Sequence, residues 1–220
     1  MYIDALFRER SIKQSDAWVS LAVCLAIHII GVQIVLPIFV PPHFSPALIS
    51  FSFFVTILAF VFPLAYLTIR YGAIQKSDFI PNGKDLIVLL LSSLILFMYV
   101  SLFVLRYNVR VSPNMVRMFS DLSGVHYSIA LISILFVIPL LEEMLFRKYV
   151  FNIFLSRYSI SLAIILVGIF ETFLHVGYEL RQLFIIFLYS VGLTIVYFKT
   201  RLSITLALHI FLNTMFYLPT

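Results

Sequence analysis

The sequence predicts an all-α protein, a polytopic membrane helical bundle with about seven transmembrane helices. The 220 residues are 62% hydrophobic and only 11% charged, whereas an ordinary soluble domain carries about 25% charged residues. Apolar runs of about 20 residues, the length of a helix that crosses a bilayer, recur along the chain. Breaks rich in proline, glycine and asparagine separate the first runs, as expected for loops. A chain of this length and composition predicts one compact bundle.

Seven apolar segments are expected to cross the membrane. They are residues 17–39, 47–69, 86–105, 127–146 or longer, 159–176, 183–198 and 202–218. A stretch of mixed charge precedes the first segment, and this stretch is unlike the start of a cleaved signal peptide. We therefore expect residues 1–125 to hold an N-terminal cytoplasmic segment and three transmembrane helices. Residues 126–220 are expected to form a four-helix membrane core.

The distribution of basic residues predicts the orientation. With the N-terminus in the cytoplasm, eleven Lys and Arg residues lie on the inner side, Arg147 and Lys148 among them, against four outside. Basic residues favour the cytoplasmic side, so we expect a multi-pass protein of the cell membrane with its N-terminus inside. The net charge of +5 then reflects topology and contact with membrane lipids, and it does not indicate nucleic-acid binding. Cys24 is the only cysteine, which excludes an intrachain disulfide and a Cys-rich metal site.

Seven charged or polar residues interrupt segments that otherwise resemble lipid-facing helix. Such residues are costly at membrane depth and are usually functional. They are Glu142, Glu143, Arg147, Glu171, His175, His209 and Asn213. Each has an ordinary explanation by itself, such as a helix end, a buried histidine bonded to a carbonyl, or an asparagine that joins two helices. Their concentration in one small bundle favours a functional site.

The spacing of these residues predicts how they are grouped. Glu143 and Arg147 are four residues apart, so they share a helix face and can form an ion pair. Glu142 is turned by about 100° from its neighbour and lacks that partner, which leaves its carboxylate available as a general base or acid. His209 and Asn213 are also four apart and can present two polar groups to one point. That geometry suits an oxyanion hole.

The depth of the site depends on where the fourth helix ends. If this helix continues to about residue 155, Glu143 lies roughly 20 Å from the turn at Arg157. His175 then lies about 24 Å along the returning helix from Ser159. Helix tilt can bring both groups together in the middle of the bundle. A helix that stops at residue 146 would instead place them near opposite faces, so the single-site hypothesis requires the longer helix.

The order of these motifs resembles the CPBP family, the CAAX proteases and bacteriocin-processing proteins, which are also called the Abi family. The motifs are Glu-Glu-x-x-x-Arg, a helix that ends in histidine, and His-x-x-x-Asn. In this chain they are carried by Glu142, Glu143 and Arg147, by His175, and by His209 with Asn213. The resemblance covers roughly residues 127–219 and is fairly specific as a combination. The first three helices carry no matching motif.

The resemblance implies an intramembrane glutamic endopeptidase that needs no metal or other cofactor and cleaves a membrane-associated peptide or protein. Carried over by position, Glu142 activates a water molecule and His175 helps to hold it. His209 and Asn213 stabilise the oxyanion, and the Glu143–Arg147 pair supports the site. The family includes prenylated-protein cleavage, peptide processing and bacteriocin immunity, so the resemblance leaves the substrate open.

One residue departs from the family pattern. The second motif is usually Phe-x-x-x-His, but the residue four before His175 is Glu171. Glu171 shares a helix face with this histidine, so it can pair with it or supply a third carboxylate. The first arrangement would make His175 a poorer water ligand. A degenerate member that acts by binding is therefore an open alternative.

Three other functions are compatible with these residues. A metal-dependent membrane hydrolase is one, since the site offers several plausible ligands: Glu142, Glu143, Glu171, His175 and His209. The chain has no His-Glu-x-x-His motif, which weakens this alternative. The second is a non-catalytic bacteriocin-immunity or regulatory protein that binds a peptide or partner. A transporter is the weakest, because the sequence lacks paired interrupted helices in repeated halves.

Overall fold

The computed structural model describes residues 13–31, 46–107, 122, 124–175 and 178–217. Over these residues the protein is all-helical, which confirms the predicted fold class. The helices that precede the longest one are α2 (Gln14–His28), α4 (Pro46–Tyr71), the short 3-10 helix η2 (Lys76–Asp78) and α5 (Gly83–Tyr107). Those that follow it are α10 (Ile160–Phe173), α11 (Leu180–Lys199) and α12 (Leu202–Tyr217).

The longest helix runs continuously over Gly124–Leu155 and is called the site helix below. It changes geometry along its length and is divided into five parts. These are α7 (Gly124–Ile132), π-helical η3 (Ser133–Val137), α8 (Ile138–Glu142), π-helical η4 (Glu143–Phe151) and α9 (Asn152–Leu155). The longer form of the fourth helix, which the single-site hypothesis required, is therefore confirmed.

Four of the described helices are long and apolar enough to cross a membrane. They are Gln14–Gly31, Phe51–Tyr71, the site helix and α11. α10 and α12 are also apolar but shorter. The bounds agree with the predicted segments to within three residues, with two exceptions. The site helix ends at Leu155, nine residues past the shorter prediction, and residues 32–39 of the first predicted segment lie outside the described residues.

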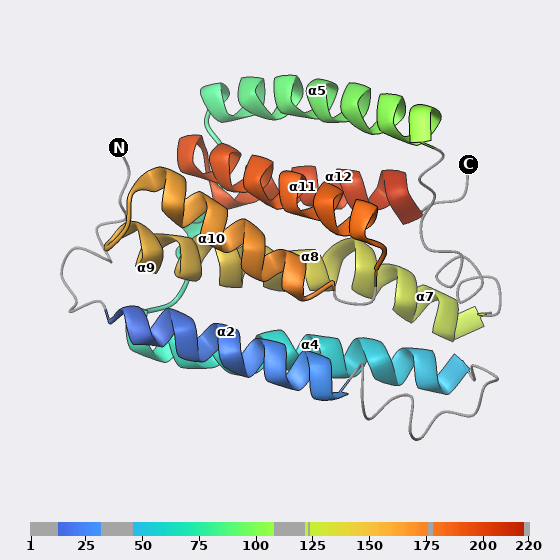
Figure 1. Ribbon diagram of the computed structural model, residues 1–220, viewed down its shortest axis with the longest axis horizontal. Helices are drawn as coiled ribbons and strands as arrows, with labels where there is room; N and C mark the ends of the chain where they lie inside the picture. Colours follow the sequence, from blue (N-terminus) through green and yellow to red (C-terminus); the bar gives the residue numbers. More distant parts are fainter. Residues whose placement is uncertain (1–12, 32–45, 108–121, 123, 176–177, 218–220) are drawn as a thin grey trace.

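The helices are stacked side by side along a common long axis (Figure 1). α5 lies at one edge and α2 with α4 at the opposite edge, while the site helix and α10 lie between them. The second half of the site helix is accordingly buried, with Leu145, Phe146 and Val150 fully enclosed, whereas Val125 and Ile132 near its start are exposed. Because this part of the site helix is buried, its polar side chains must find their hydrogen-bond partners on neighbouring helices.

Two basic residues that entered the orientation count are not loop residues. Arg147 and Lys148 both lie within η4 and are buried. The Lys148 ammonium reaches Asp78 of η2 at 2.8 Å, whereas Arg147 points into the bundle. The orientation count took both for residues of an inner loop, which is wrong because the site helix continues past the point where the apolar run ends.

A separate polar group, called the Asp16 cluster below, joins the start of α2 to the end of α4. It consists of Asp16, Tyr66, Arg70 and Tyr71. The Asp16 carboxylate accepts hydrogen bonds from Tyr71 at 2.5 Å and Tyr66 at 2.9 Å. The Arg70 guanidinium lies 3.4 Å from it. Three donors from α4 thus hold one carboxylate of α2.

Gly168 lets α10 approach α11 closely. A Cβ atom at this position would lie 2.9 Å from Val191 Cγ2 and 3.1 Å from Phe187, which is closer than van der Waals contact allows. Small residues at helix crossings in membranes permit this kind of packing. Because Glu171 follows one turn later on the same face, the close crossing brings its carboxylate to Ser190 of α11.

Candidate active site

The two adjacent glutamates lie at an irregularity of the site helix. α8 ends at Glu142 and the π-helical part begins at Glu143. In a π-helix the backbone hydrogen bonds run from residue i to i+5, and such turns are frequent at functional sites. Both side chains are buried, and the Glu143 side chain is fully enclosed. The site is therefore built where the backbone already departs from a regular helix.

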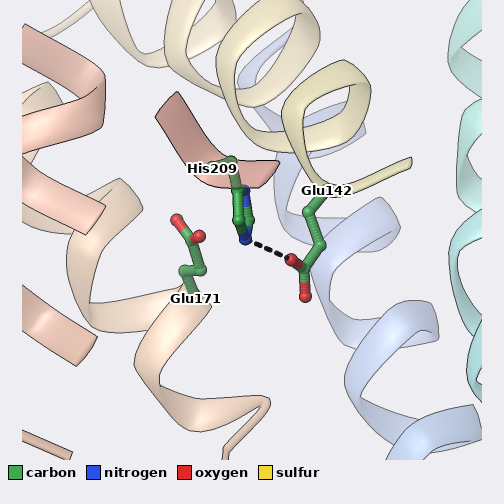
Figure 2. Close-up of side chains that lie close together, drawn as sticks. All are labelled: Glu142, Glu171 and His209. Carbon is green, nitrogen blue, oxygen red and sulfur yellow. Dashed lines mark ion pairs between the residues drawn. The ribbon is translucent and has the colours of Figure 1, made fainter. Parts of the chain in front are cut away.

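His209 of α12 joins the two glutamates. Its Nδ1 lies 2.8 Å from Glu143 Oε1, within hydrogen-bond distance, and its Nε2 lies 3.3 Å from Glu142 Oε2. Figure 2 shows the imidazole between Glu142 on one side and Glu171 on the other. The ring of Tyr189 packs edge-on against the imidazole, with centroids 5.3 Å apart. Two carboxylates and an aromatic ring thus fix the position of this histidine.

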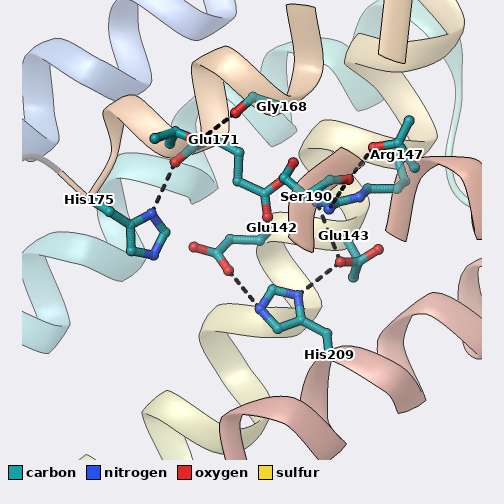
Figure 3. A network of polar contacts seen from close by, with 10 residues as sticks. Glu142, Glu143, Arg147, Gly168, Glu171, His175, Ser190 and His209 are labelled. Carbon is teal, nitrogen blue, oxygen red and sulfur yellow. Dashed lines mark hydrogen bonds and ion pairs between the residues drawn. The ribbon is translucent and has the colours of Figure 1, made fainter. Parts of the chain in front are cut away.

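Arg147 joins Glu143 to Glu171. Its Nη1 lies 3.4 Å from Glu143 Oε1 and 2.7 Å from Glu171 Oε2. Its Nη2 donates to the backbone carbonyl of Ser190 at 3.4 Å, and the Ser190 hydroxyl also donates to Glu171 Oε2 (Figure 3). The ion pair expected from the i,i+4 spacing of Glu143 and Arg147 is therefore present. The shorter pair, with Glu171 of α10, was not predicted.

Together these groups form the central cluster: Glu142, Glu143, Arg147, Glu171, Ser190 and His209. All six are buried, and they come from the site helix, α10, α11 and α12. Among the described residues, one guanidinium accompanies the three carboxylates of this cluster, and it pairs with Glu143 and Glu171. With the carboxylates ionised and the imidazole neutral, the cluster carries a net charge of −2, which follows from three negative charges and one positive.

His175 lies just beyond α10, and its contact with Glu171 differs from the expected one. Its Nδ1 is 3.0 Å from the backbone carbonyl of Glu171, so that nitrogen donates to the main chain. The Glu171 carboxylate points the other way, to Arg147 and Ser190 (Figure 3). The suggested pairing of the Glu171 and His175 side chains is thus not formed, because the guanidinium is the stronger partner. The Nε2 atom of His175 is left as a possible acceptor.

Asn213 makes a hydrogen bond that gives it a structural role. Its Nδ2 donates to the backbone carbonyl of Ile134 at 3.0 Å. In η3 the N–H of Ile138 bonds to the carbonyl of Ser133, five residues earlier. The next donor in that series would be residue 139, which is proline and has no N–H. Asn213 therefore supplies a donor that the site helix lacks, and it ties α12 to that helix.

The expected oxyanion pair is accordingly not assembled as a pair. His209 bonds to Glu143, and Asn213 bonds to Ile134. A convergence of both side chains on one point requires at least one of these contacts to change. The Asn213 amide has a second N–H, so this residue can still donate to another group while it keeps Ile134.

Sequence reasoning missed the contributions of α2 and α11. Cys24 lies close enough to Glu142 for an electrostatic interaction, and α2 passes beside this glutamate in Figure 2. His28, one turn further on, lies close enough to His175 and to the backbone of Leu174 for electrostatic interactions. The i,i+4 spacing of Cys24 and His28 was a usable signal. Ser190 gave none, because serine is common in membrane helices.

The comparison with protein families finds a match for the segment that contains the site. Residues 124–215 match the family model described as type II CAAX prenyl endopeptidase Rce1-like. Over these residues the chain is similar to the Rce1-like family. The resemblance to CAAX proteases that the motifs predicted is confirmed over these residues, and the matched region contains the whole central cluster. No curated protein and no solved structure matches the chain.

The Rce1-like segment begins with the site helix and ends within α12. It therefore takes in four helices of the bundle, each of which supplies part of the central cluster. The match covers less than half of the chain and does not extend to α2, α4 or α5. The family description names CAAX prenyl endopeptidases and says nothing of bacteriocin processing or immunity.

Proposed function

We propose that this chain is an intramembrane glutamic endopeptidase of the CAAX-protease type, with Glu142 as the general base. The environment of Glu142 is the observation that carries this proposal. Its carboxylate is buried in the Rce1-like segment and faces the Nε2 atom of His209 at 3.3 Å, whereas Arg147 is held by the other two glutamates. A buried carboxylate without a guanidinium partner is suited to take and return a proton.

The proposed reaction is hydrolysis of one peptide bond. Glu142 removes a proton from a water molecule as the water oxygen attacks the carbonyl carbon. The resulting tetrahedral intermediate carries its negative charge on the former carbonyl oxygen. When the C–N bond breaks, Glu142 returns the proton to the leaving nitrogen, and a carboxylic acid and an amine are released. The remaining site residues position the water and stabilise the oxyanion.

His175 and His209 have distinct roles in this scheme. His175 uses Nδ1 for the Glu171 carbonyl, so its Nε2 can accept a hydrogen bond from the attacking water. His209 uses Nδ1 for Glu143, so Nε2 must carry a proton to donate to the oxyanion. Asn213 adds its second N–H. Glu143 and Arg147 hold the histidine and the helix in place and take no proton.

The CAAX type of the family supports a substrate that reaches the site from the membrane. We propose a membrane-associated protein or peptide, with a prenylated C-terminal segment as the first candidate, because the matched family is described by that activity. A lipid-modified chain end concentrates the scissile bond in the bilayer. Residues 126–220 form the catalytic core in this proposal, and the cell membrane is the site of action.

The experiment compares cells that produce the wild type with cells that produce Glu142→Gln, by mass spectrometry of membrane and secreted peptides. The proposal expects at least one cleavage product that is present only with the wild type. Glu179→Gln is a matched control, because Glu179 is exposed at the start of α11 and lies outside the Rce1-like motifs. It should keep the product.

Two results would contradict the proposal. The first is a cleavage product that persists in Glu142→Gln. The second is a biological activity that survives Glu142→Gln, His175→Ala and Asn213→Ala alike, which would indicate a protein that acts by binding. Purified protein should also hydrolyse its substrate in the presence of a chelator, and loss of hydrolysis under chelation would favour a metal-dependent hydrolase.

A further inference from the structure

We propose that Glu142, Glu171 and His209 form a binding site for one transition-metal dication of the Zn²⁺ class, and that an ion bound there inhibits the peptidase. The three residues come from α8, α10 and α12 and are all buried. One ligand atom from each lies within 4.8 Å of the other two. The binding step stands by itself, while the inhibition rests on the proposed function.

The geometry needs only a small adjustment to hold such an ion. Zinc binds imidazole nitrogen and carboxylate oxygen at about 2.0–2.2 Å, so its ligand atoms lie about 3.4 Å from one another in a tetrahedral site. His209 Nε2 and Glu142 Oε2 are already 3.3 Å apart. The Glu171 oxygen must approach by at most about 1.5 Å, which is a side-chain rotation within the 4.8 Å limit.

The hydrogen bonds around the three residues are those of a supported metal site. The Nδ1–H of His209 donates to Glu143, so in the neutral imidazole the lone pair of Nε2 is directed toward Glu142. A lone pair and a carboxylate oxygen do not attract one another, so a proton or a cation belongs between them. Histidine ligands commonly donate their other ring nitrogen to a carboxylate in this way, and ligating carboxylates are themselves hydrogen-bonded.

Glu171 fits the role of a ligand because its two oxygens differ in their contacts. Both Arg147 and Ser190 bond to Oε2. Oε1 is therefore available for an ion while the guanidinium holds the carboxylate in place. The CPBP pattern has phenylalanine at this position, so the third ligand is a feature of this chain and does not follow from the family's motifs.

Charge also favours a dication. The cluster carries three carboxylates and the guanidinium of Arg147, which gives −2 with a neutral imidazole, and an ion of charge +2 brings this sum to zero. Buried charge that is not compensated is costly. One imidazole among the ligands favours zinc and related transition metals over Mg²⁺ or Ca²⁺, which prefer oxygen alone.

Bound metal and the proposed peptidase mechanism compete for the same atoms. Glu142 needs a free oxygen to take a proton from water, and His209 needs a proton on Nε2 to donate to the oxyanion. An ion occupies both. The metal therefore acts as an inhibitor whose removal restores activity, and not as the Lewis acid of the reaction.

Binding is tested by titration of the full-length protein in detergent with Zn²⁺ by calorimetry, after purification with a tag that contains no histidine. Visible absorption of a Co²⁺-substituted sample reports the coordination. The wild type should bind one ion per chain with imidazole and carboxylate ligands. Glu142→Gln should bind at least ten-fold more weakly. This variant leaves the Arg147 pairs intact, so it is expected to fold.

Further variants separate the site from other zinc ligands. Glu171→Gln and His209→Ala should also weaken binding at least ten-fold, with folding checked by size-exclusion chromatography and circular dichroism. Glu179→Gln and Cys24→Ser should keep wild-type affinity, because the first is outside the site and the second removes the only thiol. Equal affinity in all variants, or no saturable binding by the wild type, would overturn the inference.

Inhibition is tested once a substrate is in hand. Zn²⁺ should abolish hydrolysis at one equivalent, and a chelator should restore it, whereas stimulation by Zn²⁺ would contradict the competition. The two proposals fail in different ways. If hydrolysis depends on Glu142 but the protein does not bind Zn²⁺, only the metal-site proposal is contradicted. If Zn²⁺ binds saturably at the three ligands but the protein hydrolyses no peptide, only the peptidase proposal is contradicted.

Discussion

The central cluster surrounds three buried carboxylates and the Asp16 cluster surrounds one, and their balance of donors and acceptors differs. In the Asp16 cluster, Tyr66, Arg70 and Tyr71 all direct donors at one carboxylate. In the central cluster, Arg147 serves two carboxylates and His209 lies between two. The Asp16 cluster has three donors around one carboxylate, whereas the central cluster has a surplus of negative charge.

This difference in the number of donors per carboxylate distinguishes a structural cluster from a reactive one. A carboxylate that accepts hydrogen bonds from three donors of a neighbouring helix holds two helices together and has little capacity for chemistry. A surplus of buried negative charge is costly unless a proton, a cation or a substrate compensates for it. The polar residues of a membrane bundle are therefore better judged by their partners than by their number. The four changes below test this comparison, in order of expected effect.

Glu142→Gln should have the largest effect, and that effect should be on activity. Loss of a general base typically lowers the rate by about 10²- to 10⁴-fold. The side chain keeps its shape and has no ion pair with Arg147 among the described contacts, so unfolding in detergent should change little. Rates are measured on the cleavage product, and stability by thermal unfolding. A stability loss as large as the loss in activity would mean that Glu142 is structural.

Arg147→Met should mainly reduce stability. The guanidinium is fully buried between Glu143 and Glu171, and removal of one partner from a buried ion pair costs about 3–5 kcal/mol. The measurement is reversible unfolding in mixed micelles. The double variant Arg147→Met with Glu171→Gln should recover part of the loss, because one stranded carboxylate is then neutral. No recovery would contradict the pairing.

Asp16→Asn should reduce stability by less and leave activity intact. The change weakens hydrogen bonds to a charged group, which are worth about 1.5–3 kcal/mol. The amide that replaces the carboxylate keeps an acceptor oxygen for Tyr71, so the loss should lie toward the lower end. The same unfolding assay measures it, alongside the cleavage assay. A loss of cleavage with normal stability would show that the Asp16 cluster takes part in function, and the contrast drawn above would then fail.

Arg70→Met should have the smallest effect. The Arg70 side chain is 41% exposed, and exposed ion pairs contribute only about 0.2–1 kcal/mol. Tyr66 and Tyr71 continue to hold Asp16. Unfolding is compared directly with that of Arg147→Met, which removes the same functional group from the buried cluster. Similar losses of stability in the two variants would contradict the proposed difference between the clusters, which lies in their burial and in their ratio of donors to carboxylates.

Local sequence was enough to predict the helices and the residues that deserve attention. Apolar runs of membrane length determine where helices form, since the backbone must satisfy its own hydrogen bonds in a bilayer. The i,i+4 spacing fixed the Glu143–Arg147 pair for the same local reason. Charged groups in apolar segments identified Glu142 and His209, and the order of the motifs indicated the family.

Contacts between helices were decided by the tertiary structure alone. Glu171 was expected to pair with His175 or to supply a third carboxylate, and its carboxylate in fact meets Arg147 of the site helix and Ser190 of α11. The contact with Ser190 forms because the crossing at Gly168 brings α10 close to α11. Asn213 was expected beside His209 but serves the carbonyl of Ile134. Sequence spacing gives the direction of a side chain on its own helix, but its partner depends on how closely and at what rotation the next helix packs.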